Sequence, residues 1–382
     1  MEVVNLVFGK LTDKIPSHQT VLDWVEKCGL SEYSKAKEKL SLSELDYAIV
    51  MDNSITMGGQ DLHLELAAPA RHPGHALQYS DVEVIDMSVG MKWNKDMVTQ
   101  ELANTIAQVG RPPEYIVTDN GKIMTGAISN LGLPGHRDIS HSFGACLEQV
   151  YGSDPEYSDL VQKMGYARKY AHTSIANLMP PKRRAYARFM NVFDSIRWAY
   201  GVLQSDILLP KLARERFGFT KRHASLIAEM QEVMDAFRRI ESICKNDGLS
   251  KSTVQECKQL ICRTLMTSGE RPRKLGKLLL GYFDRESKLL ENDIVCHNIS
   301  SDVIESVFGH FKDRMSPNQN NGFTALTLVA PLHLKMATPE LCADFSIRER
   351  LKDTTLTLLH EWKRKALLPN TAAERSKLLK PA

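Results

Sequence analysis

The chain has 382 residues, of which 43% are hydrophobic and 25% charged, so it is not a disordered, collagen-like or disulfide-scaffold protein. This length exceeds what one compact domain usually reaches, and we expect at least two structural units. The net charge of +3 conceals an uneven distribution, because residues 163–222 carry thirteen Lys or Arg against three acidic residues. Aromatic residues lie between these cations. The pattern favours a nucleic-acid partner over the simpler alternative, a solvated helical face.

The chain shows no sign of export or of membrane insertion. No apolar run approaches the roughly 18 residues of a membrane span, and the N-terminus lacks the features of a signal peptide. The seven cysteines are scattered and never spaced C-x-x-C, which indicates reduced thiols and no zinc finger. We therefore expect a cytoplasmic protein without a membrane partner.

The first expected element is a helix over residues 15–30, capped by Ser17 and ended by Gly29. Too little chain precedes this helix to complete a helix-turn-helix. Residues 1–44 are therefore interpreted as a partial, N-terminally truncated helical or DNA-binding segment.

Three strands, a helix and a fourth strand follow. The alternating segments 46–54, 61–70 and 81–89 predict strands, and Asn94 caps an amphipathic helix over 94–109. The fourth strand is EYIVTDNG. In a β-β-β-α-β order, strands one and four can lie adjacent, so Asp52 and Asp119 at their carboxyl ends can face each other.

The rest of the chain is mostly helical. A helix is expected over 122–131, then a short segment HRDISHSF, then helices throughout 150–295. The helix over 300–315 has an apolar stripe that predicts burial, and Glu305, Gly309 and Lys312 lie on a different face. The stripe comprises Ile304, Val307, Phe308 and Phe311.

Asp52, Asp119 and Glu305 form the candidate catalytic set. Three converging carboxylates repel one another unless divalent cations lie between them, and Mg²⁺ prefers such oxygen ligands. Two Mg²⁺ ions, replaceable by Mn²⁺, would suit in-line phosphoryl transfer. Each residue alone has a structural alternative, since the aspartates suit turns and Glu305 could complete a capping box with Asp302.

The segments MDNSITMGG, IVTDNG and SSDVIESVFGHFK, with Asp138-x-x-His141 between them, resemble DDE transposases of bacterial insertion sequences in a hAT-like arrangement. The resemblance covers residues 45–335. It implies an α/β fold with an RNase H-like core, a mixed five-stranded sheet with flanking helices, interrupted by an all-α insertion. The implied ranges are 45–150 and 296–335 for the core and 151–295 for the basic insertion. Residues 336–382 are expected from their own sequence to form a helical basic tail.

The resemblance also implies an activity, which is metal-dependent cleavage of transposon-end DNA and strand transfer into target DNA. Asp52, Asp119 and Glu305 would hold the metal ions. The partners would be double-stranded DNA and at least one further copy of the chain, in the cytoplasm with the nucleoid. Two alternatives stay open, namely a nuclease or resolvase without strand transfer, and a truncated or domesticated DNA-binding remnant without catalysis.

Further residues receive roles from the same resemblance. Asp138 and His141 would support the site or orient the DNA, and Trp198 would stack on a flipped base. The expected phosphate contacts are Lys312, Lys182, Arg183, Arg184 and Arg188. The last four follow Pro-Pro and would begin a helix, where cations oppose the helix dipole unless phosphate binds them. The structural alternatives are a histidine satisfied by a nearby carboxylate, a buried tryptophan and an ordinary surface lysine.

Overall fold

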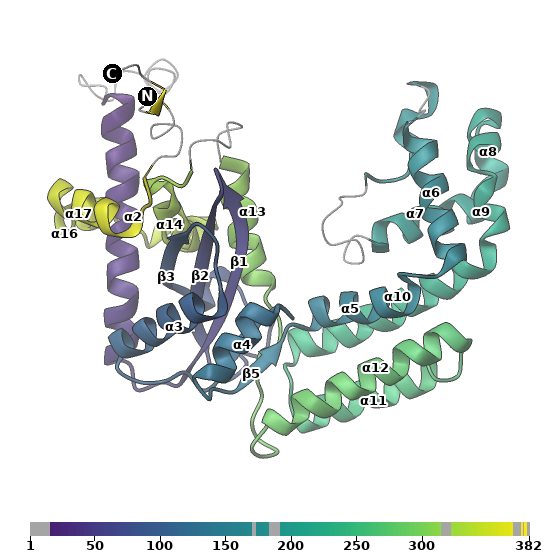
Figure 1. Ribbon diagram of the computed structural model, residues 1–382, viewed down its shortest axis with the longest axis horizontal. Helices are drawn as coiled ribbons and strands as arrows, with labels where there is room; N and C mark the ends of the chain where they lie inside the picture. Colours follow the sequence, from purple (N-terminus) through teal and green to yellow (C-terminus); the bar gives the residue numbers. More distant parts are fainter. Residues whose placement is uncertain are drawn as a thin grey trace. The chain divides into compact units, whose positions relative to one another are not determined.

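The computed structural model of the protein describes residues 16–169, 173–182, 192–314 and 322–369, together with 376, 378 and 379. The chain divides into two compact units, shown in Figure 1. The sheet unit takes its described residues from Met1–Ala70, Leu77–Pro134 and Ser301–Ala382. The helical unit takes them from Arg71–Ala76 and Gly135–Ser300. The α/β class expected from the sequence is confirmed.

The sheet is mixed and has five strands in the order β3-β2-β1-β4-β5. β1 pairs with β2 in antiparallel orientation, β2 with β3 likewise, and β1 with β4 in parallel. The predicted adjacency of the first and fourth strands is therefore confirmed. The strands are β1 (Tyr47–Met57), β2 (Gln60–Pro69), β3 (Glu83–Gly90), β4 (Ile116–Thr118) and β5 (Gly135–Arg137).

Helices cover both faces of this sheet. Helices α3 (Lys95–Val109) and α4 (Lys122–Asn130) share one apolar cluster with Ile49 and Met51 of β1. Helices α13 (Asp302–Arg314) and α14 (Val329–Met336) share the other cluster with Ala48 and Val50. Residues of β1 therefore alternate between two buried faces. The predicted caps of Asn94 on α3 and Ser17 on the first helix are both present.

The first helix, α2 (His18–Leu42), is much longer than predicted. The expectation that Gly29 ends it is wrong. A side chain at Gly29 would come within 2.0 Å of the Leu328 carbonyl oxygen, so this glycine allows a close approach of backbone to the helix. The glycine therefore reflects tertiary packing, and α2 continues past it.

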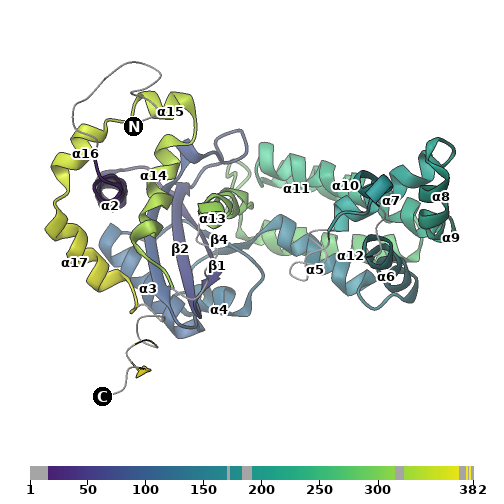
Figure 2. The same cartoon turned by 90° about the horizontal axis from the view of Figure 1, so that it is seen from above.

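The C-terminal segment packs on α2. Figure 2 views α2 end-on, with α16 (Ile347–Asp353) and α17 (Leu356–Ala366) beside it, and α15 (Pro339–Ala343) precedes them. Arg350 lies 2.6 Å from the carboxylate of Glu32, and Lys363 lies 2.5 Å from that of Glu26. Both glutamates are buried, so residues 336–369 belong to the sheet unit rather than to a separate tail.

The helical unit is built around one apolar cluster, in which the rings of Phe143 and Phe237 stack 3.5 Å apart. The predicted helical character of residues 150–295 is confirmed for the described residues. The main segment of the unit runs from Gly135 to Ser300 and is wider than the range expected for the insertion. Its α-helices are α5 (Ile139–Tyr151), α6 (Pro155–Lys169), α7 (Val192–Gln204), α8 (Lys211–Phe217), α9 (Phe219–Arg222), α10 (Ala224–Asn246), α11 (Lys251–Thr264) and α12 (Glu270–Glu286).

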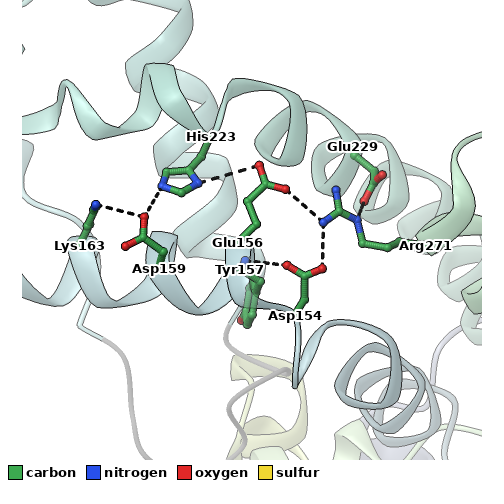
Figure 3. A network of polar contacts seen from close by, with 8 residues as sticks. All are labelled: Asp154, Glu156, Tyr157, Asp159, Lys163, His223, Glu229 and Arg271. Carbon is green, nitrogen blue, oxygen red and sulfur yellow. Dashed lines mark hydrogen bonds and ion pairs between the residues drawn. The ribbon is translucent and has the colours of Figure 1, made fainter.

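A polar network joins three helices of this unit (Figure 3). Arg271 of α12 contacts Asp154, Glu156 and Glu229 at 3.0, 3.2 and 2.9 Å. Burial opposes ionisation of Asp154, but hydrogen bonds from the Tyr157 N–H and from Arg271 outweigh it and lower its pKa. The network therefore ties α6 and α10 to the start of α12.

None of the seven cysteines, all of which are described, forms a disulfide. Within the described part of the chain, no helix is both long and apolar enough to span a bilayer.

Candidate functional site

The two aspartates come together through strand register. The parallel pairing aligns Ile49 with Ile116 and Val50 with Val117. The same offset, continued by two residues, places Asp52 of β1 beside Asp119, which directly follows β4. Both aspartates are partly buried. Adjacent parallel strands thus bring two carboxylates to one edge of the sheet.

Both aspartates also belong to the face that packs against α13. Ala48 and Val50 on β1, and Tyr115 and Val117 near β4, lie in the cluster that contains Ile304 of α13. Side chains alternate along a strand with period two, so Asp52 continues the first series and Asp119 continues the second. The carboxylates therefore lie on the layer that carries the third predicted acidic residue.

Glu305 is exposed near the start of α13. The predicted stripe of Ile304, Val307, Phe308 and Phe311 is buried, as expected. The backbone N–H of Glu305 donates to the Ser301 carbonyl at 3.2 Å, and the helix begins at Asp302. Glu305 is then the fourth helical residue, one beyond the position of a capping-box glutamate. This geometry disfavours the capping-box alternative.

Each aspartate is oriented by its own loop. The Asp52 carboxylate accepts a hydrogen bond from the Asn53 N–H at 2.6 Å. The Asp119 carboxylate accepts one from the Gly121 N–H at 2.8 Å, and a side chain at Gly121 would meet that same oxygen at 2.8 Å. These backbone donors fix the direction of each carboxylate, and its other oxygen can still bind a cation.

The donor chemistry suits Mg²⁺ bound with water and phosphate. Among the described residues, no three His, Cys, Asp or Glu side chains group closely enough to hold a metal ion by themselves. Mg²⁺ is commonly bound through one or two carboxylates, with waters and substrate phosphates completing its shell. Asp52 and Asp119 supply such a pair, and Glu305 lies on the helix packed against their strand.

A β-bulge next to Asp52 leads into a buried network that the sequence analysis did not identify. The β1–β2 register shifts between Asp52 and Ile55, so that β1 carries one extra residue. Asn53 lies in this bulge, and its side-chain oxygen is 2.6 Å from His63 Nδ1. His63 Nε2 is 3.0 Å from a carboxylate oxygen of Glu65, and both side chains are fully buried.

The partners determine the protonation of His63. Both of its ring nitrogens face oxygen acceptors, so both donate when Glu65 is ionised. Burial opposes the charge, but the hydrogen bond and the charge of Glu65 outweigh it and raise the pKa of His63. The His63 ring therefore holds Asn53, the residue that follows Asp52, from a position between two oxygen acceptors.

The network continues into further acidic residues. Asp86 pairs with Glu65 across the strands and accepts hydrogen bonds from Tyr33 and Ser88 at 3.1 and 2.8 Å. Burial and the charge of Asp86 raise the pKa of Glu101. A sequence signal existed, because His63 and Glu65 alternate with Leu62, Leu64 and Leu66. This alternation predicts the burial of His63 and Glu65 only if helices cover both faces of the sheet.

Asp138 and His141 lie in the helical unit and have a local role. Asp138 is fully buried and caps α5, accepting a hydrogen bond from the His141 N–H at 2.7 Å. The neighbouring His136 contacts Glu286 and His297, each at 2.9 Å. Burial, and then the closeness of His136, lower the pKa of His297 to about 4.

The predicted DNA-contacting residues are spread over both units. Lys312 is exposed on the same face of α13 as Glu305 and Gly309. Lys182 is exposed but not helical, so the predicted helix does not begin there. Trp198 donates its indole N–H to the Leu178 carbonyl at 2.8 Å and packs edge-on against Phe217, which favours the packing alternative. Arg183, Arg184 and Arg188 lie outside the described residues.

A scan of this sequence against models of known protein families finds no match. A search of curated proteins finds no relative either.

Proposed function

We propose that this chain is a DDE-type transposase that cuts transposon-end DNA and joins it to target DNA with the help of Mg²⁺. One observation carries the proposal. The β1–β4 register brings Asp52 beside Asp119 on the face of the sheet that packs against the helix carrying Glu305. Two carboxylates held side by side on adjacent strands cost stability unless a cation compensates them, which is typical of a functional site.

The fold proposed for the sheet unit is RNase H-like. An antiparallel β1-β2-β3 arrangement with β4 parallel to β1 supports it. The residues of the helical unit interrupt the sheet unit between Pro134 and Ser301, which agrees with an inserted domain. The third carboxylate then comes from chain that follows the insertion, as the resemblance implies.

The carboxylates would hold the metal and the scissile phosphate in place. Bound Mg²⁺ supplies activation of the attacking oxygen and stabilisation of the leaving oxygen. Asp52 and Asp119 present oxygen ligands from a rigid sheet edge, with the Asn53–His63 hydrogen bond holding the bulge after Asp52. Glu305 approaches from α13, and Lys312 on the same helix face would contact phosphate.

The helical unit would bind the DNA. Its described cations include exposed residues on α6, α8 and α9, and Lys182, Arg183, Arg184 and Arg188 add four charges to the same stretch of sequence. Clustered Lys and Arg bind the phosphate backbone through counterion release. Because transposition joins two DNA ends, the active form would hold at least two copies of the chain, in the cytoplasm on the nucleoid.

Labelled duplexes from the DNA that flanks the gene test the activity, incubated with Mg²⁺ or Mn²⁺ and the full chain. We expect metal-dependent nicking at a defined end and joined products. Asp119→Asn keeps the acceptor oxygen for Gly121 and should lower cleavage at least about 100-fold. The matched control is Asp96→Asn, which changes an exposed aspartate in the first turn of α3 and should cleave normally.

The products separate the alternatives. Cleavage without joining would indicate a nuclease or resolvase. Salt-sensitive DNA binding without cleavage, unchanged in Asp119→Asn, would indicate a non-catalytic DNA-binding protein and would overturn the enzymatic proposal.

A further inference from the structure

Two large aliphatic side chains project from a turn in the helical unit. The 3₁₀ turn η3 (Asp206–Leu208) connects α7 to α8, and Ile207 and Leu208 on it are 88% and 85% exposed. The next residue, Leu209, packs against the apolar core of the unit. The turn is therefore anchored to the core and still presents an adjacent Ile-Leu pair to solvent. The adjacent pair therefore leaves a small patch of aliphatic surface in contact with water.

The turn is held by several contacts. The Leu208 N–H donates to the Ser205 carbonyl at 2.9 Å. The Asp206 carboxylate pairs with Lys221 of α9 at 2.7 Å. Pro210 follows immediately, where its ring restricts the backbone before α8 begins. These contacts order the turn before any partner binds.

Exposed cations follow the projecting pair closely in the sequence. In α8, Ala213 and Phe217 are buried, so the solvent side of the helix carries Lys211 and Arg214. In α9, Lys221 and Arg222 are exposed. The acidic residues of this region are Asp206, which is paired with Lys221, and the exposed Glu215.

The size and charge of this surface favour DNA over a protein partner. Besides Ile207 and Leu208 on η3, Leu212 on α8 is an exposed large apolar side chain, with 41% of its surface accessible. Specific protein interfaces bury about 800 Å² per partner around a core that is depleted in charge. A small apolar projection among cations matches instead the wedges that proteins insert between base pairs from the minor groove, where flanking Lys and Arg contact phosphates.

We propose that Ile207 and Leu208 insert as a wedge into a base step of the bound duplex and kink it, while the cations of α8 and α9 hold the flanking phosphates. The inference rests on the proposed DNA-binding function. It adds a deformation of the DNA, with flexible pyrimidine–purine steps as the favoured sequence.

The test uses the full chain and a duplex of about 30 base pairs with a central TA step, labelled at its ends with a fluorescent donor and acceptor. We expect the unaltered protein to increase energy transfer by bending the duplex. The double variant Ile207→Ser/Leu208→Ser should abolish the increase and weaken binding about tenfold. Its salt dependence should be unchanged, because the phosphate contacts remain.

Two variants control for the loss of apolar surface. Ile294→Ser removes an aliphatic side chain that is also 88% exposed in the helical unit, but that lies beside Asp293 in an acidic stretch; it should bend DNA normally. Ile207→Met/Leu208→Met keeps two apolar side chains and should retain bending. Unchanged melting temperatures would confirm that all variants are folded.

Each remaining outcome overturns the proposal at a distinct point. Bending by the double serine variant would show that the pair is not a wedge. Binding without bending by the unaltered protein would reject the wedge and leave DNA binding intact. A change in sedimentation of the double variant without DNA, with bending retained, would assign the pair to a protein interface. Failure of the unaltered protein to bind any duplex would reject the DNA-binding function as well.

Discussion

Each of the two units buries a histidine against a glutamate, and the histidine pKa shifts in the two networks have opposite signs. In the sheet unit, His63 lies between Glu65 and the amide oxygen of Asn53, and its pKa is raised. In the helical unit, His136 lies between Glu286 and His297, and the pKa of His297 is lowered to about 4. The amide oxygen of Asn53 accepts a hydrogen bond from the His63 ring, whereas a second imidazole disfavours a charge on its neighbour. At His63 the Glu65 carboxylate outweighs the effect of burial on the pKa, whereas at His297 burial is the larger cause of the lowered pKa.

The positions of the networks differ as well. The His63 network ends at the bulge beside Asp52, where the proposed chemistry occurs. The His136 network joins the first and last segments of the helical unit, because the Ile139 N–H also donates to the Ile299 carbonyl at 3.0 Å. The first network holds the bulge next to Asp52, the candidate Mg²⁺ ligand. The second closes the helical unit where the chain enters and leaves it.

The largest expected effect concerns the ion pairs of the helical unit. Arg271→Met should lower the free energy of unfolding by about 3 kcal/mol, because it leaves three carboxylates without their shared cation. Lys274→Met, on the same helix, removes an exposed pair with Glu270 and should cost less than about 0.5 kcal/mol. Chemical denaturation measures both, and equal losses would contradict the role given to Arg271.

The next effect is the stabilisation of the protein by Mg²⁺, which we expect to depend on the sheet unit. Mg²⁺ at about 100 times its dissociation constant should stabilise the protein by roughly 2–3 kcal/mol. Asp52→Asn should remove this gain and, without metal, raise stability by about 0.5–1 kcal/mol, since a repulsion with Asp119 is lost. Thermal unfolding with and without Mg²⁺ measures this, with Asp96→Asn as the control. Retained Mg²⁺ stabilisation in Asp52→Asn would exclude Asp52 as a ligand.

Two helical glycines should respond in opposite directions. Gly29→Ala in α2 should destabilise the protein by about 2 kcal/mol or more, because the new Cβ meets the backbone of Leu328. Gly281→Ala in α12 has open space around it and should stabilise the protein by about 0.5–1 kcal/mol. Denaturation midpoints give the signs. A neutral Gly29→Ala would mean that the close approach is absent in solution.

The smallest effect is a pair of opposed pH dependences. The pKa of His63 is raised on folding, so its stabilisation is complete below about pH 6.5 and is lost as pH rises through the raised value. The pKa of His297 is lowered, so stability is lost as pH falls from about 6.5 towards 4. The His297 change should be about 1 kcal/mol once it is reduced for solvent screening.

Hydrogen exchange can assign these changes to their units. Protection of β2 amides should fall at alkaline pH, and protection around Ile299 should fall at acidic pH, after correction for intrinsic exchange. His63→Asn should remove the alkaline loss, and His297→Gln the acidic one. Parallel pH profiles in both units would contradict the comparison.

Local sequence determined several elements correctly. The caps at Ser17 and Asn94 bond to backbone three residues away, and Gly58 and Gly59 adopt positive φ in the turn between β1 and β2. The segments 46–54, 61–70 and 81–89 form strands as predicted, because the preference for an extended chain depends on near neighbours. The sequence of elements allowed strands one and four to lie adjacent, and the structure pairs them, which brings Asp52 beside Asp119.

Tertiary structure decided the features whose partners are distant in the chain. From the sequence, Gly29 is typical of a helix end. In the structure it lies within α2, because the backbone of Leu328 packs closely against it. From its place in an alternating strand, His63 is expected to be exposed. In the structure it is fully buried, because helices cover both faces of the sheet. Arg271 looks like an ordinary helix-surface cation until α6 and α10 bring its carboxylates to it. Caps and periodic patterns depend on residues that are near one another in the chain, so the sequence alone can predict them. The contacts of Gly29, His63 and Arg271 depend on which of many possible packings the whole chain adopts.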